Sequence, residues 1–199
     1  MERLKIVVIG ASAGGVDALI TLLRELPASF HLPIMLVLHV PPDQPSLLSQ
    51  VLAFHCELQF VEAQDKQPLQ AGWVYCAPPG CHMMVEPDGQ DAYVSLNVDP
   101  PVNLSRPSID LLFESAAHAY GQGVLAVMLS GASDDGAAGM RTVFALGGQG
   151  WAQAADEAAV ATMPQAALAH NPRCKEMPLR GMVAQLLAVR QAMPLEMTA

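Results

Sequence analysis

The stretch Gly10-Ala11-Ser12-Ala13-Gly14-Gly15 decides the fold of this chain. It follows an apolar run, residues 4–9, and precedes an amphipathic segment, residues 16–26. This order predicts a buried strand that turns sharply into a helix, because small residues allow a tight bend and the close approach of another molecule. Two kinds of site share the pattern Gly-x-Ser-x-Gly. One is the exposed nucleophile of a serine hydrolase, and the other is a glycine loop that binds an anion at a helix N-terminus.

Strand and helix patterns alternate through the first half of the chain, which is typical of crossovers in a parallel sheet. Continuously apolar runs predict buried strands, and apolar residues at helical spacing predict the helices. The predicted strands are 5–9, 33–38, 58–61, 73–77, 123–129 and 149–153, and a hairpin joins 82–86 to 92–96. The predicted helices are 16–26, 46–54, 108–121, 137–146, 158–170 and 179–191.

Length and composition limit the class of protein. With 199 residues, of which 52% are hydrophobic, the chain can bury the core of one domain. Its apolar runs are too short to span a membrane, and its N-terminus lacks the apolar region of a secretory signal. We therefore expect a soluble cytoplasmic protein. The net charge of −9 argues against a nucleic-acid surface and is compatible with a small-molecule or protein substrate.

The four cysteines form no Cys-x-x-Cys pair, and buried or free thiols are expected in a cytosolic domain. A zinc site built from cysteines and neighbouring histidines fits no structural zinc spacing, so no metal is expected. The residues considered for it are Cys56, Cys76, Cys81, His55 and His82. Nucleotide binding is also disfavoured, because Gly-x-Ser-x-Gly-Gly is not the dinucleotide pattern and a histidine, not an acid, ends the second predicted strand.

Three residue types needed for acyl transfer, Ser12, His39 and Asp135, each follow the carboxyl end of a predicted buried strand. Ligands of open α/β sheets bind outside that edge, so side chains far apart in sequence can converge there. A serine hydroxyl needs a base to become nucleophilic, histidine suits that work, and a carboxylate fixes the imidazole tautomer. Backbone amides at the start of the first helix, at Ala13 and Gly14, are available to an oxyanion.

Each of these residues also has a purely structural interpretation. Ser12 can be the N-cap of the first helix, and His39 can be a core histidine at a strand end. Asp135, beside Asp134, can cap the helix that begins at residue 137. His82 opens the predicted hairpin near the expected mouth of the site and is a candidate for substrate contact. Met83 is a further candidate for lining that opening.

Several stretches together resemble the catalytic domain of the chemotaxis receptor protein-glutamate methylesterases, the CheB-type family. They occur in the order typical of that family and cover most of the chain, from near residue 5 to about 170. The stretches are residues 9–15, 38–42, 75–83, 100–103, 106–113 and 130–140.

The resemblance implies a doubly wound α/β fold with a mostly parallel sheet, helices on both faces and a small antiparallel hairpin. It implies hydrolysis of glutamate γ-methyl esters on the cytoplasmic helices of methyl-accepting chemoreceptors, with release of methanol. Deamidation of receptor glutamines is implied as a second activity. No metal or organic cofactor is implied.

Carried over by motif, Ser12 falls at the nucleophile, His39 at the general base and Asp135 at the acid that orients it. The oxyanion donors fall at the backbone amides of Ala13 and Ala132. His82 and Arg106 fall in motifs near the substrate cleft of the family. Two positions depart from the family pattern. Ala13 stands where threonine is common, and Asp134 offers a second acid, although Asp135 keeps the register before Gly-Ala-Ala-Gly.

The best-known members of the family carry an N-terminal receiver domain, whereas the first predicted strand here starts within a few residues of Met1. We therefore expect a single catalytic domain, residues 1–199, without a receiver domain in this chain, or else a truncated piece. A separate receiver domain or a methyltransferase is then a candidate regulatory partner. Two alternatives stay open: a serine esterase or amidase of the same fold acting on another substrate, and a non-catalytic sensory interaction module.

Overall fold

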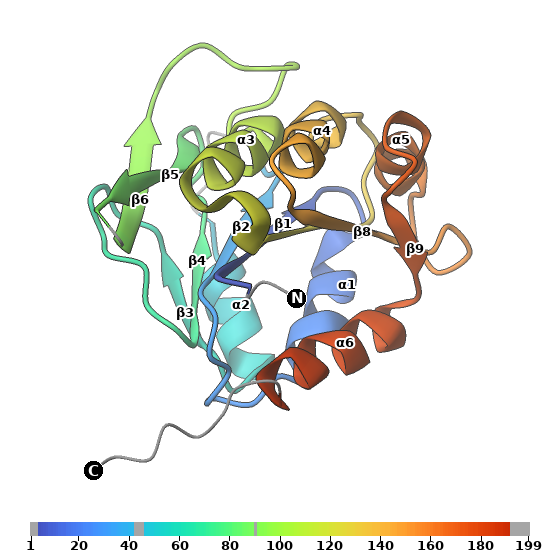
Figure 1. The fold of residues 1–199 in the computed structure, drawn as a ribbon, viewed down its shortest axis with the longest axis horizontal. Coiled ribbons are helices and arrows are strands. Elements are labelled where there is room, and N and C mark those ends of the chain that lie inside the picture. Colours follow the sequence, from blue (N-terminus) through green and yellow to red (C-terminus); the bar gives the residue numbers. More distant parts are fainter. Residues whose placement is uncertain (1–3, 42–45, 90, 192–199) are drawn as a thin grey trace.

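The computed structural model describes residues 4–41, 46–89 and 91–191, so Pro42 of the motif at 38–42 and both chain ends lie outside the described residues. Within this part, one sheet has the strand order β3-β4-β2-β1-β7-β8-β9, and every neighbouring pair is parallel (Figure 1). The strands are β1 (Ile6–Ala11), β2 (Ile34–Leu38), β3 (Gln59–Glu62), β4 (Trp73–Cys76), β7 (Val124–Met128), β8 (Gln149–Gln153) and β9 (Lys175–Met177). The strand order reverses between β1 and β7, which makes that junction the place where ligands bind in such sheets.

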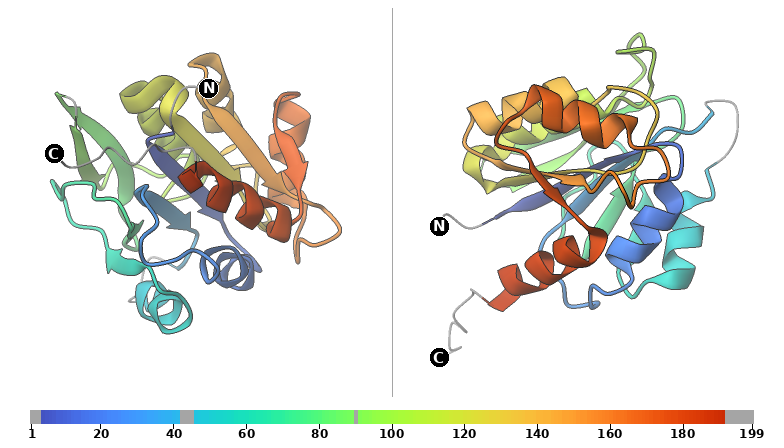
Figure 2. Two further views of the ribbon diagram at one scale, coloured as in Figure 1. Left: turned by 60° about the horizontal axis from the view of Figure 1, so that its bottom comes forward. Right: turned by 90° about the vertical axis from the view of Figure 1, so that its right-hand side faces the viewer.

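Helices cover both faces of the sheet, as Figure 2 shows in its right-hand view. Helices α1 (Gly15–Leu23), α2 (Leu48–His55) and α6 (Leu179–Gln191) pack on one face, and α3 (Ile109–Tyr120), α4 (Ala137–Ala145) and α5 (Thr162–His170) pack on the other. Side chains alternate along β1, so Val7 and Ile9 enter the first apolar layer while Ile6 and Val8 enter the second. The expected doubly wound fold is confirmed.

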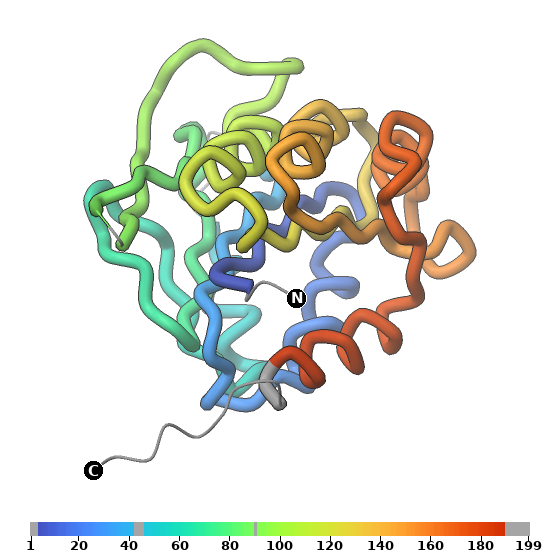
Figure 3. The backbone as a smooth tube through the Cα atoms, viewed as in Figure 1, coloured from blue at the N-terminus to red at the C-terminus, as the bar shows by residue number. Residues whose placement is uncertain are grey.

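An antiparallel hairpin, β5 (His82–Asp88) and β6 (Asp91–Asn97), packs beside α3 through buried residues such as Val85 and Val94. The loop that follows β6 leads to α3 and projects beyond the helices, as the yellow-green segment of the tube in Figure 3 shows. No helix in the described ranges is long and apolar enough to cross a membrane.

Two elements differ from the sequence-based expectation. Helix α5 begins at Thr162 and not at residue 158, because residues 154–161 form a loop. Pro164 is the third residue of α5, where its missing N–H removes no helical hydrogen bond. Strand β9 was not expected. It has only three residues, and since none of them is buried, the sequence offers no apolar run there.

Candidate active site

The glycine-rich stretch forms the elbow between β1 and α1. Ala11 ends β1, Ser12 is half-buried in the turn, and Gly14 is the N-cap of α1 with φ of 74°. A Cβ on Gly14 would lie 2.5 Å from Ala159 Cβ, so both the backbone conformation and the space require glycine. Because Gly14 precedes α1 without a side-chain cap, the interpretation of Ser12 as the N-cap is wrong.

His39 follows β2 directly beside the elbow. The parallel pairing of β1 and β2 continues past the strand ends, because the His39 N–H donates to the Ala11 carbonyl at 3.1 Å. The imidazole Nε2 lies 2.9 Å from Asp135 Oδ2, and the side chain of His39 is 16% exposed whereas that of Asp135 is 0% exposed. The structure therefore brings together two residues that lie 96 positions apart in the sequence.

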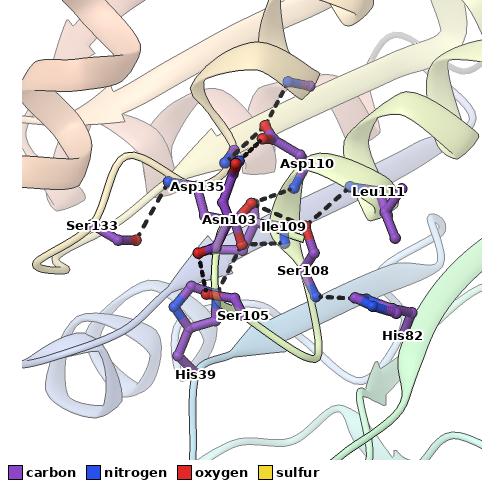
Figure 4. Close-up of polar contacts among 12 residues, drawn as sticks. His39, His82, Asn103, Ser105, Ser108, Ile109, Asp110, Leu111, Ser133 and Asp135 are labelled. Carbon is purple, nitrogen blue, oxygen red and sulfur yellow. Dashed lines mark hydrogen bonds and ion pairs between the residues drawn. The ribbon is translucent and has the colours of Figure 1, made fainter. Parts of the chain in front are cut away.

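Asp135 accepts hydrogen bonds from the first turn of α3 as well as from His39 (Figure 4). Oδ2 also accepts from the Ile109 N–H at 2.7 Å, while Oδ1 accepts from the Asp110 N–H and the Ser108 hydroxyl, each at 3.0 Å. The N-terminus of a helix has unsatisfied amides and a partial positive charge, both of which favour a carboxylate. Asp135 does not cap α4, since the N-cap of α4 is Gly136 without a side-chain cap.

A second carboxylate completes an exchange between the two helices. Asp110, in the first turn of α3, accepts from the Gly136 N–H at 2.9 Å and from the Gly139 N–H at 2.6 Å, at the start of α4. Its other oxygen accepts from Asn103 Nδ2 at 2.7 Å. The first amides of α3 thus donate to Asp135, which precedes α4, and amides at the start of α4 donate to Asp110 of α3. These bonds fix α3 and α4 against each other at the site.

The pKa values of the two carboxyl groups move in opposite directions. Burial opposes ionisation of Asp135, but hydrogen bonds from His39 and from the amides of Ile109 and Asp110 outweigh it and lower its pKa below 3.8. Burial raises the pKa of Asp110 above 3.8, and the negative charge of Asp135 raises it further. Hydrogen bonds from the amides of Gly139 and Gly136 lower this pKa but do not outweigh the burial. Asp135 is therefore the member of the pair that holds its negative charge most firmly.

The charge on Asp135 also defines the state of His39. An ionised carboxylate only accepts hydrogen bonds, so Nε2 of His39 carries a proton and donates a hydrogen bond to Oδ2. In this tautomer Nδ1 is the nitrogen without a proton, and it is the atom available to a partner hydroxyl. Among the described residues, neither Nδ1 of His39 nor the hydroxyl of Ser12 makes a hydrogen bond.

Ser12 is held against the turn that follows β7. The Ser12 N–H donates to the Ser130 carbonyl at 2.9 Å, and a Cβ on Gly131 would lie 2.9 Å from Ser12 Cβ. The Ser130 hydroxyl, fully buried, donates to the Ala13 carbonyl at 2.7 Å and accepts from the Val160 N–H at 2.9 Å. These two hydrogen bonds fix the orientation of the peptide group between Ala13 and Gly14.

The two backbone amides expected to serve an oxyanion lie on these two turns. Ala13 belongs to the elbow and Ala132 to the turn after β7, and both residues are exposed. Within the described ranges, the N–H groups of Ala13 and Ala132 have no hydrogen-bond partner. Both amides are consequently available to a ligand.

The three candidates for substrate contact occupy different environments. His82 is fully buried: its Nε2–H donates to the Pro100 carbonyl, and its Nδ1 accepts from the Ser108 N–H, each at 3.2 Å. Met83 is also fully buried, within the apolar layer that contains α3. Neither side chain lines a cleft, which corrects the expectation for both. The expectation was wrong because the sequence does not show that the hairpin packs against α3.

Arg106 does lie at the site. It lines a cavity of about 220 Å³ together with His39, and the remaining lining residues are Val40, Pro101, Leu104, Ser105 and Pro107. Its Nη1 donates to the carbonyls of Val98 at 2.9 Å and Asp99 at 3.1 Å. Its buried Nε has no hydrogen-bond partner in the part of the chain that the structure describes.

Sequence reasoning missed the residues that hold this machinery. Ser108 is the N-cap of α3, where its hydroxyl accepts from the Leu111 N–H at 3.5 Å, and the same hydroxyl donates to Asp135. Asp110 and Ser130 were not singled out. The signal that could have found Asp110 is the pair of polar residues in Ser108-Ile109-Asp110, at the start of a predicted helix. No group of three or more potential metal ligands occurs among the described residues.

Comparison with known proteins agrees with this geometry. Residues 7–186 match the profile of the CheB methylesterase family. A protein-glutamate methylesterase/protein-glutamine glutaminase of Myxococcus xanthus is 37% identical over 181 residues, which are 91% of this chain and 52% of that protein. A Leptospira interrogans protein, to which the same activities are assigned provisionally, is 38% identical over 81% of this chain and 82% of its own length.

A solved structure shares the whole architecture. The crystal structure of the Thermotoga maritima CheB methylesterase catalytic domain superimposes with a TM-score of 0.90 at 30% identity, and the match covers 94% of this chain and 100% of that one. A parallel α/β sheet that places a histidine against a buried carboxylate, beside a Gly-x-Ser-x-Gly elbow, is an arrangement typical of serine hydrolases. The chain belongs to the CheB methylesterase family. It spans about half the length of the Myxococcus relative.

Proposed function

We propose that this protein hydrolyses glutamate γ-methyl esters on the cytoplasmic helices of methyl-accepting chemoreceptors, with Ser12 as nucleophile, His39 as base and Asp135 as the orienting acid. The observation that supports these roles best is the contact of 2.9 Å between His39 Nε2 and the buried Asp135 carboxylate, at the strand end beside the Ser12 elbow. Membership of the family supports the reaction and the substrate class.

In the first half of the reaction, the Ser12 hydroxyl attacks the ester carbonyl carbon while its proton passes to His39 Nδ1. The negative charge of the tetrahedral intermediate falls on the former carbonyl oxygen, where the N–H groups of Ala13 and Ala132 can donate to it. Asp135 stabilises the imidazolium that forms, because it is already ionised. Collapse of the intermediate breaks the bond to the methoxy oxygen, which takes the proton from His39 and leaves as methanol.

In the second half, water attacks the glutamyl-enzyme and gives a proton to His39. Collapse of the second intermediate returns the proton from His39 to Ser12 and releases the glutamate side chain as the acid, which loses its proton to water. A glutamine side chain offers the same carbonyl with ammonia as leaving group, so the same residues would deamidate receptor glutamines. Arg106 is proposed to contact the substrate, because it lines the cavity that contains His39.

The proposal includes the setting of the reaction. Receptor helices that carry methyl esters are cytoplasmic, which places the enzyme in the cytoplasm. Either a receiver domain or a methyltransferase is proposed as its regulatory partner. Membership of the CheB methylesterase family supports the first of these two points.

The test compares wild type with Ser12→Ala on a methylated receptor cytoplasmic fragment, with methanol as the readout. We expect Ser12→Ala to lower methanol release by about 10³-fold or more, because the nucleophile is lost. Within the described residues the Ser12 hydroxyl makes no hydrogen bond, so the free energy of unfolding should change by less than about 1 kcal/mol. Activity retained by Ser12→Ala would remove Ser12 from the nucleophile role.

Two controls separate this function from the alternatives. A generic small ester is offered in parallel, and turnover of that ester without turnover of the methylated receptor would favour an esterase with another substrate. A fluorophosphonate probe is added to folded wild type and to Ser12→Ala. Failure to label wild type at Ser12 would favour a non-catalytic interaction module.

A further inference from the structure

The loop between β6 and α3 contains a tight turn at residues 102–105, and the residues of this turn are unfavourable for its backbone conformation. The Ser105 N–H donates to the Val102 carbonyl at 2.8 Å, and the Val102 N–H donates to the Ser105 carbonyl at 3.1 Å. The two residues between them have positive φ, 48° at Asn103 and 63° at Leu104. Positive φ at both central residues is the requirement of a type I′ turn, for which Asn-Gly is strongly preferred. Leucine occupies the position that favours glycine.

Within the described part of the chain, the side chain of Leu104 makes no apolar packing contact that would offset this unfavourable backbone conformation. Leu104 is 100% exposed, the highest value among the exposed large apolar residues of the described ranges. Its backbone is in the left-handed region, which strains residues with a Cβ. Strained residues that persist without a packing reason cluster at binding and catalytic sites. Both properties of Leu104 disfavour it in the free protein, and burial of its side chain by a bound molecule would offset them.

The turn is held in place from three sides. The amide of Asn103 donates to Asp110 Oδ2 at 2.7 Å, and Asp110 is fixed in turn by the first amides of α4 (Figure 4). The carbonyl of Pro100 accepts from the buried His82, and Arg106 donates to the carbonyls of Val98 and Asp99. Leu104 is therefore presented by a tethered turn, which lowers the entropy lost when a partner binds it.

The turn borders the active site. Leu104 and His39 line the same cavity of about 220 Å³, together with Arg106. A protein that places an esterified glutamate at His39 must bring the surface around that glutamate against the rim of this cavity. The side chain of Leu104 is the fully exposed apolar group on that rim.

We propose that Leu104 is a specificity-determining residue that packs against an apolar patch of the protein substrate next to the esterified glutamate. This inference rests on the proposed function and adds a contact that distinguishes the receptor from small esters. A small ester lacks the flanking protein surface that would pack against Leu104. Leu104 therefore lowers KM for the protein substrate and leaves the chemical step unchanged.

The test is Leu104→Gly, since glycine removes the side chain and suits the backbone of the turn. The substrates are a methylated receptor cytoplasmic fragment and N-acetyl-glutamate γ-methyl ester amide, with methanol release as the readout for both. We expect kcat/KM for the fragment to fall about tenfold through KM, since burial of a leucine side chain is worth at least that factor. The value of kcat/KM for the small ester should stay within about twofold of wild type, because this ester carries no flanking apolar surface to pack against Leu104.

Two further variants serve as matched controls. Leu104→Met keeps an apolar side chain at the tip and should retain most of the activity on the fragment. Phe54→Ser removes another exposed apolar side chain, 85% exposed in the last turn of α2, which does not line this cavity. It should leave kcat/KM for the fragment unchanged.

The outcomes separate this inference from the proposed function. Equal kcat/KM of wild type and Leu104→Gly on the fragment would overturn the inference alone, as would an equal loss in Phe54→Ser. A lower urea midpoint for Leu104→Gly would also overturn it, because the fold would then need the leucine. No methanol from wild type and fragment would refute the proposed function, and the inference with it.

Discussion

Asp135→Asn tests the acid of the site most directly, because all four groups around this carboxylate are donors. His39 Nε2 and the Ile109 N–H donate to Oδ2, and the Ser108 hydroxyl and the Asp110 N–H donate to Oδ1. Asparagine has one acceptor oxygen and an NH2 group, which itself donates. Whichever way the amide is oriented, its NH2 group faces one backbone N–H that cannot rotate away.

The two orientations have different consequences. With NH2 at the Oδ2 position, the Ile109 N–H loses its acceptor, and His39 can only accept there by moving its proton to Nδ1. With NH2 at the Oδ1 position, the Ser108 hydroxyl can rotate to accept, but the Asp110 N–H is left unpaired. One unpaired buried amide costs about 1–3 kcal/mol and the loss of a charged hydrogen bond a similar amount. We expect the free energy of unfolding to fall by about 3 kcal/mol.

The effect on catalysis should be larger than the effect on stability. Without the carboxylate, His39 loses both its tautomer control and the charge that stabilises the imidazolium, a change that lowers kcat by about 10⁴-fold in serine proteases. The assay is methanol release under single-turnover conditions, with urea unfolding of the same sample. Asp134→Asn is the matched control, because Asp134 is exposed and its carboxylate accepts no hydrogen bond within the described structure. A larger loss in Asp134→Asn than in Asp135→Asn would refute the assignment of the acid.

The remaining predictions concern Asp110 and pH. Asp110→Ala leaves the Gly136 and Gly139 amides unpaired and should lower the free energy of unfolding by about 2–4 kcal/mol. Asp110→Asn can keep both bonds if Asn103 turns its amide, so it should lose less than about 1 kcal/mol; equal urea midpoints of the two variants would contradict this. The lowered pKa of Asp135 gives stability that is present above its unfolded pKa of about 3.9 and is lost as pH falls through the folded value. The raised pKa of Asp110 has the opposite sign: stability is lost as pH rises from about 3.9 through the folded value. Asp110→Asn removes the opposing contribution, so it should lose more stability than wild type between pH 6 and pH 3 in urea unfolding, and a smaller loss would refute the assigned directions.

Much of the fold could be predicted because its signals are local. The apolar runs of β1, β2 and β7 are buried along their whole length and could be recognised without an alignment. The edge strand β9 could not, because exposed residues in an edge strand leave no pattern. Parallel strands present their carboxyl ends at one edge of a sheet, and this rule was enough to predict that Ser12, His39 and Asp135 lie near one another.

The contacts that position these residues could not be predicted, because they depend on how two helices meet. The sequence shows that Ser108 can cap α3, but nothing in it shows that Asp135 would accept from the amides of α3 while Asp110 accepts from those of α4. The burial of His82 likewise depends on the hairpin packing against α3. The strain at Leu104 appears only in the backbone, since the sequence marks that region as a loop and no more.

The choice between Asp134 and Asp135, which the sequence left open, follows from the residue after them. Gly136 has φ of 96°, and a Cβ there would lie 2.3 Å from Met128 Cε and 2.5 Å from Ile109 Cγ2. Its N–H is held by Asp110. The chain must therefore turn at this point, and the turn leaves Asp135 buried against α3 and Asp134 exposed. Moving the acid by one residue would require another residue to adopt the conformation of Gly136, so the contacts that join α3 to α4 also determine which carboxylate reaches His39.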